Sequence, residues 1–206
     1  LNSLIITIPT VRGTLFLSSL AGYSLAMHRF KLNLLVFAMF IAGNFVPYQI
    51  LMIPVRNISI ELGMYNSHMG LIIFHIAFQT GFCTFFLRNF IKELPFELIE
   101  AARADGATEW TIYRKIIIPL TIPALAALGV LEFTFIWNDY FWALILTQGD
   151  TVKPITVGLD VLRGQWTTAW NLVSAGSVVA ALPPVIMFFI LQRQFIQGLT
   201  FGAVKG

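Results

Sequence analysis

Residues 100–119 read EAARADGATEWTIYRKIIIP and form the longest charged interruption in an otherwise apolar chain. The first half is rich in helix formers, and Pro95 precedes it at a place where the first turn of a helix tolerates proline. Gly106 can end this helix, because glycine adopts a left-handed backbone conformation at little cost. Thr108 can cap a second helix that runs toward Pro119, since its hydroxyl can accept from the backbone N–H groups that follow. The stretch therefore predicts a helix-bend-helix that is exposed to water between two membrane spans.

The composition of the whole chain is that of an integral membrane protein. Of its 206 residues, 57% are hydrophobic and 11% are charged, whereas about a quarter of the residues of a soluble domain are charged. A helix that crosses the roughly 30 Å hydrocarbon core needs about 20 mostly apolar residues. Five stretches reach that length, and they lie near 2–27, 33–55, 69–90, 118–147 and 171–192. These runs are continuous and lack the alternation of barrel strands, so we expect an all-α membrane protein with a single domain, 1–206.

Two of the predicted spans contain residues that disturb a helix. Gly43, Asn44 and Pro47 are expected to bend the second span midway. Pro183 and Pro184 are expected to interrupt the hydrogen-bond ladder of the fifth span. The first span instead carries small residues at four-residue spacing, which allow another helix to approach closely: Ser18, Gly22 and Ala26.

The basic residues set the orientation, because lysine and arginine are retained on the cytoplasmic side of a membrane. Nine of the 13 flank the spans on one side: Arg29, Lys31, Arg88, Lys92, Arg103, Arg114, Lys115, Arg193 and Lys205. Three lie on the other side: Arg56, Lys153 and Arg163. We therefore expect the stretch 100–119 and the C-terminus to be cytoplasmic and Leu1 to lie outside. Since Leu1 is not a methionine and already reads as part of a span, we also expect sequence before it.

Ionisable groups inside a membrane are expensive and are therefore candidates for function. Glu132 and Asp139 are seven residues apart, about two helical turns, so they are expected to share a face of the fourth span. Arg12 lies inside the first span. Trp137 and Asn138 add stacking and hydrogen-bonding surface of the kind that suits a sugar. These five residues are the candidates for a water-filled translocation path.

The same residues also have a structural interpretation. Asp139 can lie at the outer interface of the membrane, and Arg12 can pair with Glu132 to hold two helices together. Aromatic residues such as Trp137 are often interfacial anchors or packing residues. From the sequence alone, we expect Arg12 and Glu132 to face one interior cavity, and both interpretations of Asp139 stay open.

Several kinds of chemistry lack a motif in this chain. It has no G-x-x-x-x-G-K-[ST] loop for ATP, and no H-E-x-x-H or G-x-S-x-G pattern of a hydrolase. His28, His68 and His75 are scattered and do not have metal-ligand spacing. No basic arm suggests a nucleic-acid partner. We therefore expect no catalytic residue, metal or cofactor in this chain.

The opening stretch resembles the E-A-A-x-x-x-G-x9-I-x-L-P signature of the membrane subunits of bacterial ATP-binding cassette importers. Six residues fall on its positions at matching spacing: Glu100, Ala101, Ala102, Gly106, Ile116 and Pro119. The leucine position is occupied by Ile118, a conservative difference. The ending 198–206 is similar to that of the carbohydrate-uptake branch, in particular the smaller maltose-type permease subunit.

This resemblance implies a type I ABC importer transmembrane domain with six spans, one of them before Leu1. It implies alternating access for a sugar or oligosaccharide, at the plasma membrane of a bacterium or archaeon, or the inner membrane if the cell is Gram-negative. The implied partners are a second, similar permease subunit, two copies of a cytoplasmic ATPase that holds ATP and Mg²⁺, and an extracytoplasmic sugar-binding protein.

The resemblance also implies two contact regions for the ATPase. The loop 92–117 is similar to a coupling loop, and its candidate contact residues are Glu97, Glu100, Ala101, Ala102, Arg103, Asp105 and Gly106. The tail 195–206 is similar to a segment that inserts between ATPase subunits, with candidate contacts Gly198, Gly202 and Lys205.

Two other functions compete with this interpretation. A proton-coupled secondary carrier would use Glu132 and Asp139 as its relay, but it leaves the charged helix-bend-helix without a role. A membrane scaffold would need no polar residues inside its spans. Uptake by sealed vesicles distinguishes the three: dependence on ATP and a separate ATPase supports the importer, dependence on a pH gradient alone supports the carrier, and no uptake supports the scaffold.

Overall fold

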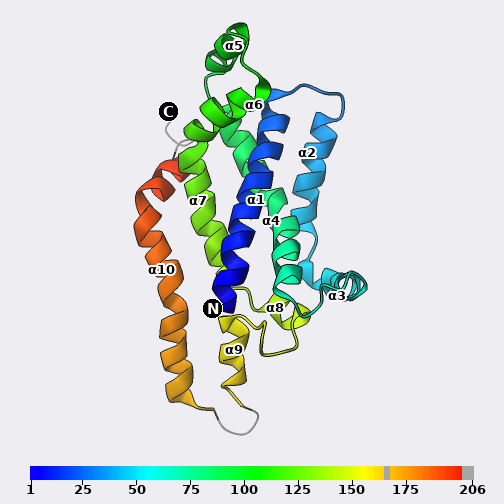
Figure 1. Ribbon diagram of the computed structural model, residues 1–206, viewed down its shortest axis with the longest axis vertical. Helices are drawn as coiled ribbons and strands as arrows, with labels where there is room; N and C mark the ends of the chain where they lie inside the picture. Colours follow the sequence, from blue (N-terminus) through cyan, green and yellow to red (C-terminus); the bar gives the residue numbers. More distant parts are fainter. Residues whose placement is uncertain (165–167, 201–206) are drawn as a thin grey trace.

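The computed structural model describes residues 1–164 and 168–200 of the chain. Its α-helices, labelled in Figure 1, are α1 (Asn2–Met27), α2 (Asn33–Ala42), α3 (Met52–Glu61), α4 (His68–Lys92), α5 (Phe96–Ala104), α6 (Glu109–Ile112), α7 (Ile118–Trp137), α8 (Phe141–Leu146), α9 (Ile155–Val161) and α10 (Trp170–Thr200). Two short 3-10 turns, Gly43–Phe45 and Tyr48–Leu51, join α2 to α3, and a π turn, Tyr113–Ile117, joins α6 to α7. These described residues contain no strand, so the all-α prediction is confirmed.

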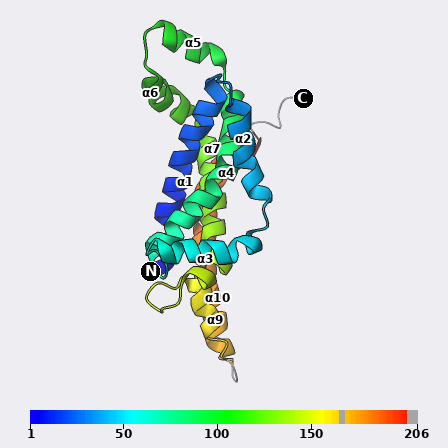
Figure 2. The same cartoon turned by 90° about the vertical axis from the view of Figure 1, so that its right-hand side faces the viewer.

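Long apolar helices make up the membrane-spanning part. Four helices are long and apolar enough to cross a bilayer, namely Asn2–Met27, His68–Lys92, Glu109–Trp137 and Trp170–Ile196. A further pair, Asn33–Phe45 and Tyr48–Glu61, passes the same test as one span with a 90° bend. The bend predicted from Gly43, Asn44 and Pro47 is therefore present. It turns α3 across the end of the bundle, at about a right angle to α2 (Figure 2).

One predicted boundary was wrong. The fourth span was expected to reach residue 147, but α7 ends at Trp137 and a separate helix, α8, begins at Phe141. In the fifth span, Pro183 and Pro184 have no N–H groups for the hydrogen-bond ladder, as predicted, but α10 continues through both prolines to Thr200. Proline is tolerated inside membrane helices because local adjustments and neighbouring groups can satisfy the carbonyls that it leaves free.

Helix α1 packs against both α4 and α7 and has one open face (Figures 1 and 2). It runs in the same direction as α4 and meets it closely: a Cβ atom on Gly22 would lie 3.1 Å from both the backbone nitrogen of Arg88 and the Cβ of Leu87. The Ser18 hydroxyl also donates to the Thr80 carbonyl, at 3.3 Å. The stripe of small residues therefore has the packing role predicted for it.

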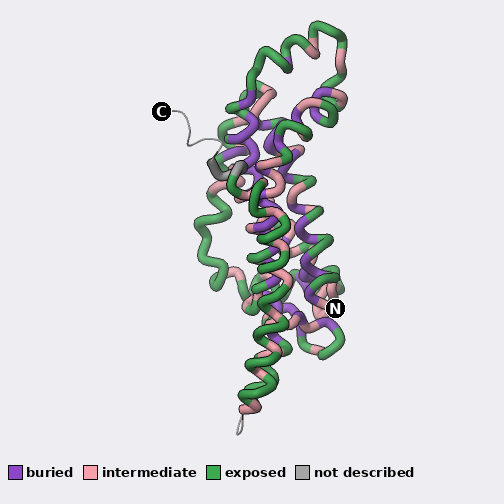
Figure 3. The backbone as a smooth tube through the Cα atoms, turned by 90° about the vertical axis from the view of Figure 1, so that its left-hand side faces the viewer, coloured by how far each residue is buried: buried purple, intermediate pink, exposed green. Residues whose placement is uncertain are grey.

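Helix α10 packs along α7 at the edge of the bundle and leaves most of its own surface uncovered. The Trp137 indole donates to the Ala180 carbonyl, at 2.8 Å, across this contact. Figure 3, seen from the side of α10, shows mainly exposed and half-buried residues along it, and none of its most apolar window is buried. This large apolar surface is available for lipid or for another membrane subunit.

The two ends of the bundle differ in construction. Helices α5 and α6 project from one end, near the last described turn of α10, while α3, α8, α9 and the start of α1 lie at the opposite end (Figures 1 and 2). The positions of these segments match the two sides assigned from the basic residues.

The close contact at Gly22 gives the first test of the fold. Gly22→Val places side-chain atoms against the backbone of α4, which we expect to lower the free energy of unfolding by about 1–3 kcal/mol. Reversible unfolding in mixed detergent micelles measures the change. Gly158→Val is the matched control, because a Cβ at Gly158 meets nothing within 4 Å. Equal stability of the two variants would contradict the packing described.

Candidate functional site

The elbow, which we define as residues 92–117, begins with a short exposed helix that ends at a glycine. Helix α5 starts directly after Pro95, so the proline is its N-cap rather than part of its first turn. Gly106 has a φ of +80°, the left-handed conformation predicted for it. The Gly106 N–H donates to the Arg103 carbonyl and the Ala107 N–H to the Ala102 carbonyl, each at 3.0 Å. This pair of hydrogen bonds is a Schellman motif, which satisfies the last carbonyls of the helix and fixes the direction of the bend.

The second helix of the elbow starts as its sequence predicted. The Thr108 hydroxyl accepts from the Thr111 N–H, at 3.3 Å, and caps α6. The helix then continues through the π turn and past Pro119 into α7 without a break. The second half of the elbow is therefore the first part of a single membrane helix, so a displacement of the elbow acts directly on α7.

Glu109 is the polar centre of the elbow. Arg103 donates to both of its carboxylate oxygens, from Nε to Oε1 at 2.8 Å and from Nη2 to Oε2 at 3.2 Å. The Tyr23 hydroxyl donates to Oε2 at 2.5 Å, and His28 Nε2 lies 3.4 Å from the same oxygen. The hydrogen bond to Glu109 raises the pKa of Arg103, so its guanidinium stays charged. One carboxylate thereby joins α5, α6 and the end of α1.

A second contact attaches the elbow to α1 one turn further along. The Tyr113 hydroxyl, at the start of the π turn, lies 2.7 Å from the Ser19 hydroxyl. The rings of Tyr113 and Tyr23 are 5.5 Å apart. Together with Glu109, these residues make the base of the elbow rigid while its tip extends into solvent.

The sequence analysis did not identify Glu109, Tyr23 or His28 as site residues. Glu109 lies directly after the predicted cap Thr108, and an acidic residue in a first helical turn is a recognisable signal. Tyr23 and His28 lie at the end of the first span, about 80 residues from Glu109 in sequence. Only the folded bundle brings them to the elbow.

The predicted contact residues of the elbow lie mostly on its open surface. The exposed ones are Glu97, Glu100, Ala101, Asp105 and Gly106, while Ala102 and Arg103 are half-buried. In the described part of the chain, Glu97, Glu100 and Asp105 take part in no ion pair. The exposed tip therefore presents free carboxylates beside small alanine side chains. Ile99, which is 1% exposed, holds α5 against the core.

Asp139 has a structural role at the far end of α7. Its two carboxylate oxygens accept from the backbone N–H groups of Trp142, at 3.2 Å, and Ala143, at 2.9 Å, which caps α8. His75 Nε2 lies 3.5 Å from Asp139 Oδ2. Because α7 ends at Trp137, Asp139 does not continue the helical face of Glu132, as the seven-residue spacing had predicted.

Arg12 and Glu132 do not meet. Glu132 is fully buried between helices, where the Cys83 thiol donates to its Oε1 at 3.2 Å and its Oε2 has no hydrogen-bond partner among the described residues. Arg12 lies on the exposed surface of α1 and forms no ion pair within the described ranges. The predicted shared cavity, and the structural pairing considered beside it, are therefore wrong.

The remaining predicted site residues lie on α7, directly after it, in α10 or outside the described residues. Trp137 is 5% exposed and holds α10 through its indole, while Asn138 is exposed and donates to the Thr134 carbonyl at 2.9 Å. Gly198 lies in the last turns of α10, whereas Gly202 and Lys205 lie outside the described residues. Among residues 1–164 and 168–200, no three histidine, cysteine, aspartate or glutamate side chains gather as a metal site would require.

The structure is a bundle of bent and straight membrane helices with a solvent-exposed elbow, and sequence comparison identifies its family. The family model described as "Binding-protein-dependent transport system inner membrane component" matches residues 16–201. The chain belongs to this family, so the predicted resemblance to ABC importer membrane subunits is confirmed.

Individual relatives support the same family. The chain is 39% identical over 187 residues to a probable ABC transporter permease protein of Pyrococcus horikoshii, covering 90% of this chain and 68% of that protein. It is 37% identical over 205 residues to the arabinooligosaccharides transport system permease protein AraQ of Halalkalibacterium halodurans, covering 100% and 73%. A crystal structure of a bacterial ABC transporter involved in the import of the acidic polysaccharide alginate has the same fold, with a TM-score of 0.75 and 23% identity over 94% of this chain and 72% of that one.

The contacts of Glu109 give a prediction for the elbow. Glu109→Gln removes the charge that Arg103 and His28 approach, so we expect amide hydrogen exchange over 96–112 to become about two- to tenfold faster, as for a loss of about 0.5–1.5 kcal/mol. Solvent screening keeps the ion-pair part below about 1 kcal/mol, because both side chains are partly exposed.

Mass-spectrometric hydrogen exchange on the purified protein checks this prediction. Glu100→Gln is the matched control, since Glu100 is exposed on the same elbow and makes no ion pair there. The role assigned to Glu109 would be refuted if both variants exchanged at the rate of the parent protein.

Proposed function

We propose that this chain is a permease subunit of an ATP-driven importer of sugars or oligosaccharides, and that the elbow couples it to a separate ATPase. The single observation that carries the coupling is the Glu109 junction, because it ties the exposed tip of α5 to α1 and α7 together. Family membership and the arabinooligosaccharide relative support the transport class and the sugar substrate.

The elbow has the physical properties that force transmission needs. Its tip offers Glu97, Glu100 and Asp105 for orientation and the small side chain of Ala101 for close approach to a partner. Its base cannot rotate freely, because Glu109 and Tyr113 are both hydrogen-bonded to α1. A displacement of the tip is therefore passed to two membrane helices at once and can tilt them between inward-open and outward-open arrangements.

The far end of α7 is held as well. Asp139 caps α8 and approaches His75 of α4, so α7 lies between a polar junction at each end of the bundle. We propose that α7 acts as the rod of the alternating-access movement. In this scheme ATP and Mg²⁺ are held by the ATPase, and the permease residues supply only contacts and movement.

The proposed assembly contains a second, similar permease subunit, two copies of the cytoplasmic ATPase and an extracytoplasmic sugar-binding protein, in the plasma membrane of a bacterium or archaeon. The exposed surface of α10 provides room for a membrane partner. The proton-carrier alternative is not favoured, because Glu132 and Asp139 lie on different elements and both oxygens of Asp139 already accept backbone hydrogen bonds.

Arg12 is the strongest candidate for the translocation path. It lies in the middle of α1 on an exposed face, and its neighbours one turn away, Ile8 and Phe16, are exposed and apolar. A charged side chain facing lipid at this depth is costly. We propose that this face of α1 is covered by the second permease subunit and that Arg12 borders the aqueous path between them.

The coupling proposal is tested by ATPase activity of the assembled complex. Gly106→Val strains the bend, since a non-glycine residue at positive φ costs about 1–2 kcal/mol, and Glu100→Ala removes a tip carboxylate. We expect either change to reduce the stimulation of ATPase activity by loaded binding protein about fivefold or more. Glu61→Gln, at the opposite end of the bundle, should leave it unchanged. Full stimulation in both elbow variants would refute coupling through this loop.

The position of Arg12 is tested by crosslinking. A photoreactive probe attached at Arg12→Cys in the complex is expected to label the second permease subunit and to be quenched by water-soluble reagents. The matched site is Val178→Cys on α10, an exposed position at the edge of the bundle. Labelling of lipid alone from position 12 would contradict the proposal.

A further inference from the structure

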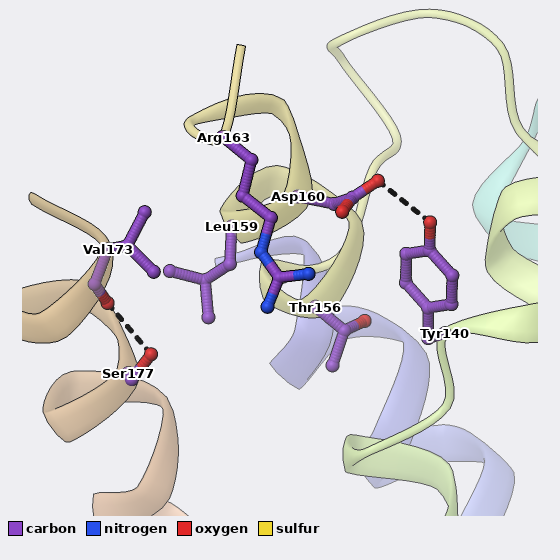
Figure 4. Close-up of a pocket in the computed structure, with 7 residues that line it drawn as sticks. All are labelled: Tyr140, Thr156, Leu159, Asp160, Arg163, Val173 and Ser177. Atoms are coloured by element: carbon purple, nitrogen blue, oxygen red, sulfur yellow. Dashed lines mark hydrogen bonds between the residues drawn. The ribbon is translucent and has the colours of Figure 1, made fainter. Parts of the chain in front are cut away.

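A polar pocket lies at the end of the bundle opposite the elbow, where α9 faces α10. It has a volume of about 400 Å³ and is lined by Tyr140, Thr156, Leu159, Asp160, Arg163, Val173 and Ser177 (Figure 4). This volume is within the range of roughly 300–1,000 Å³ that is usual for small-molecule sites. None of these residues has a part in the coupling described above.

The pocket holds one negative and one positive side chain that do not neutralise each other directly. The Tyr140 hydroxyl donates to Asp160 Oδ2, at 2.8 Å, which orients the carboxylate. The same hydrogen bond raises the pKa of Tyr140, so its hydroxyl stays protonated as a donor. The Arg163 guanidinium makes no ion pair among the described residues, and Figure 4 shows it reaching into the centre of the pocket.

The remaining lining suits a ligand with hydroxyl groups and an apolar ring face. Thr156 and Ser177 donate their hydroxyl hydrogens to the carbonyls of Asp139 and Val173, at 2.6 Å and 2.7 Å, which leaves their oxygens able to accept. Leu159 and Val173 supply the aliphatic wall. A carboxylate acceptor beside a guanidinium donor can bind neighbouring hydroxyls, since each hydroxyl both donates and accepts.

We propose that this pocket is a binding subsite for a neutral saccharide at the outer end of the permease. The inference rests on the proposed function, because it gives the transported sugar a binding site on this subunit before the sugar enters the translocation path. The opposite charges of Asp160 and Arg163 balance, which favours a neutral ligand over an acidic one. A saccharide bound between α9 and α10 would also contact Tyr140 and Thr156. Tyr140 follows Asp139 in sequence and Thr156 donates to its carbonyl, so binding of the saccharide would affect the segment that follows α7.

Saturation-transfer difference NMR on the complete complex in lipid nanodiscs tests the proposal without the binding protein. The probes are raffinose, maltotriose, arabinotriose and trehalose, at about 1 mM, where weak sites are occupied. At least one probe should give a signal with the parent complex. Arg163→Met and Asp160→Asn should each weaken its binding about tenfold, since each removes a charge-assisted hydrogen bond.

Arg56→Met is the matched control, because Arg56 lies at the same end of the bundle with its guanidinium 5.2 Å from the Tyr65 ring. It should bind the probe as the parent does. Unaltered elution and basal ATPase activity show that each variant is assembled, and Tyr140→Phe gives an independent variant of the pocket.

The proposal would be overturned if no probe bound, or if Arg163→Met and Asp160→Asn bound like the control. It is also wrong if Arg163→Met weakens capture of the sugar-free binding protein while saccharide binding is retained, since the pocket is then a protein-docking site. Stimulation of ATPase activity by loaded binding protein is measured on the same parent complex. Normal stimulation without saccharide signals refutes the subsite alone, whereas absent stimulation refutes the proposed function.

Discussion

The hydrocarbon interior of a bilayer supplies no water to backbone N–H and C=O groups, so each membrane segment must satisfy its own hydrogen bonds by forming a helix. The long apolar runs of this chain follow that constraint over most of their length, and the second run departs from it at the bend between Phe45 and Tyr48. The same constraint explains where polar side chains lie. Glu109 and Asp139 bind their partners at opposite ends of α7, and inside the bundle Glu132 is enclosed by other helices and bound by Cys83. Under the proposed coupling, function is concentrated at the ends of the spans.

Helix α7 connects these ends. On the side of the elbow it continues from α6 through a π turn, and Arg103, Tyr23 and His28 all approach one carboxylate at its start. Such π turns are frequent at functional sites in helices. On the other side, α7 ends at Trp137 and the chain turns into α8 and then α9. The polar pocket lies between α9 and the start of α10. A rod with a polar junction at each end can transmit movement across a membrane without any buried catalytic group.

Much of the fold was readable from the sequence, and the failures have identifiable causes. Hydrophobic length predicted the spans, and Gly106 and Thr108 predicted the bend and cap of the elbow from local backbone preferences. The end of the fourth span was missed because residues 141–146 are again apolar: α8 is a short, partly buried helix whose start is fixed by the Asp139 side chain, and no change of periodicity marks that break. The pairing of Arg12 with Glu132 was predicted wrongly, because sequence spacing does not show which face of a helix is covered.

The sequence by itself determined the membrane class, the approximate spans and the elbow, because these depend on segment length and on local conformational preference, and the charge at segment ends predicts the orientation of the spans. Only the tertiary structure decided which side chains meet. Tyr23 and His28 reach Glu109, and Tyr140 and Arg163 share a pocket with Ser177, because parallel and antiparallel helices bring distant residues to the same end of the bundle. Such contacts depend on the rotation and register of packed helices. Close helix contacts at positions such as Gly22 set this rotation and register, and the amino-acid composition does not encode them.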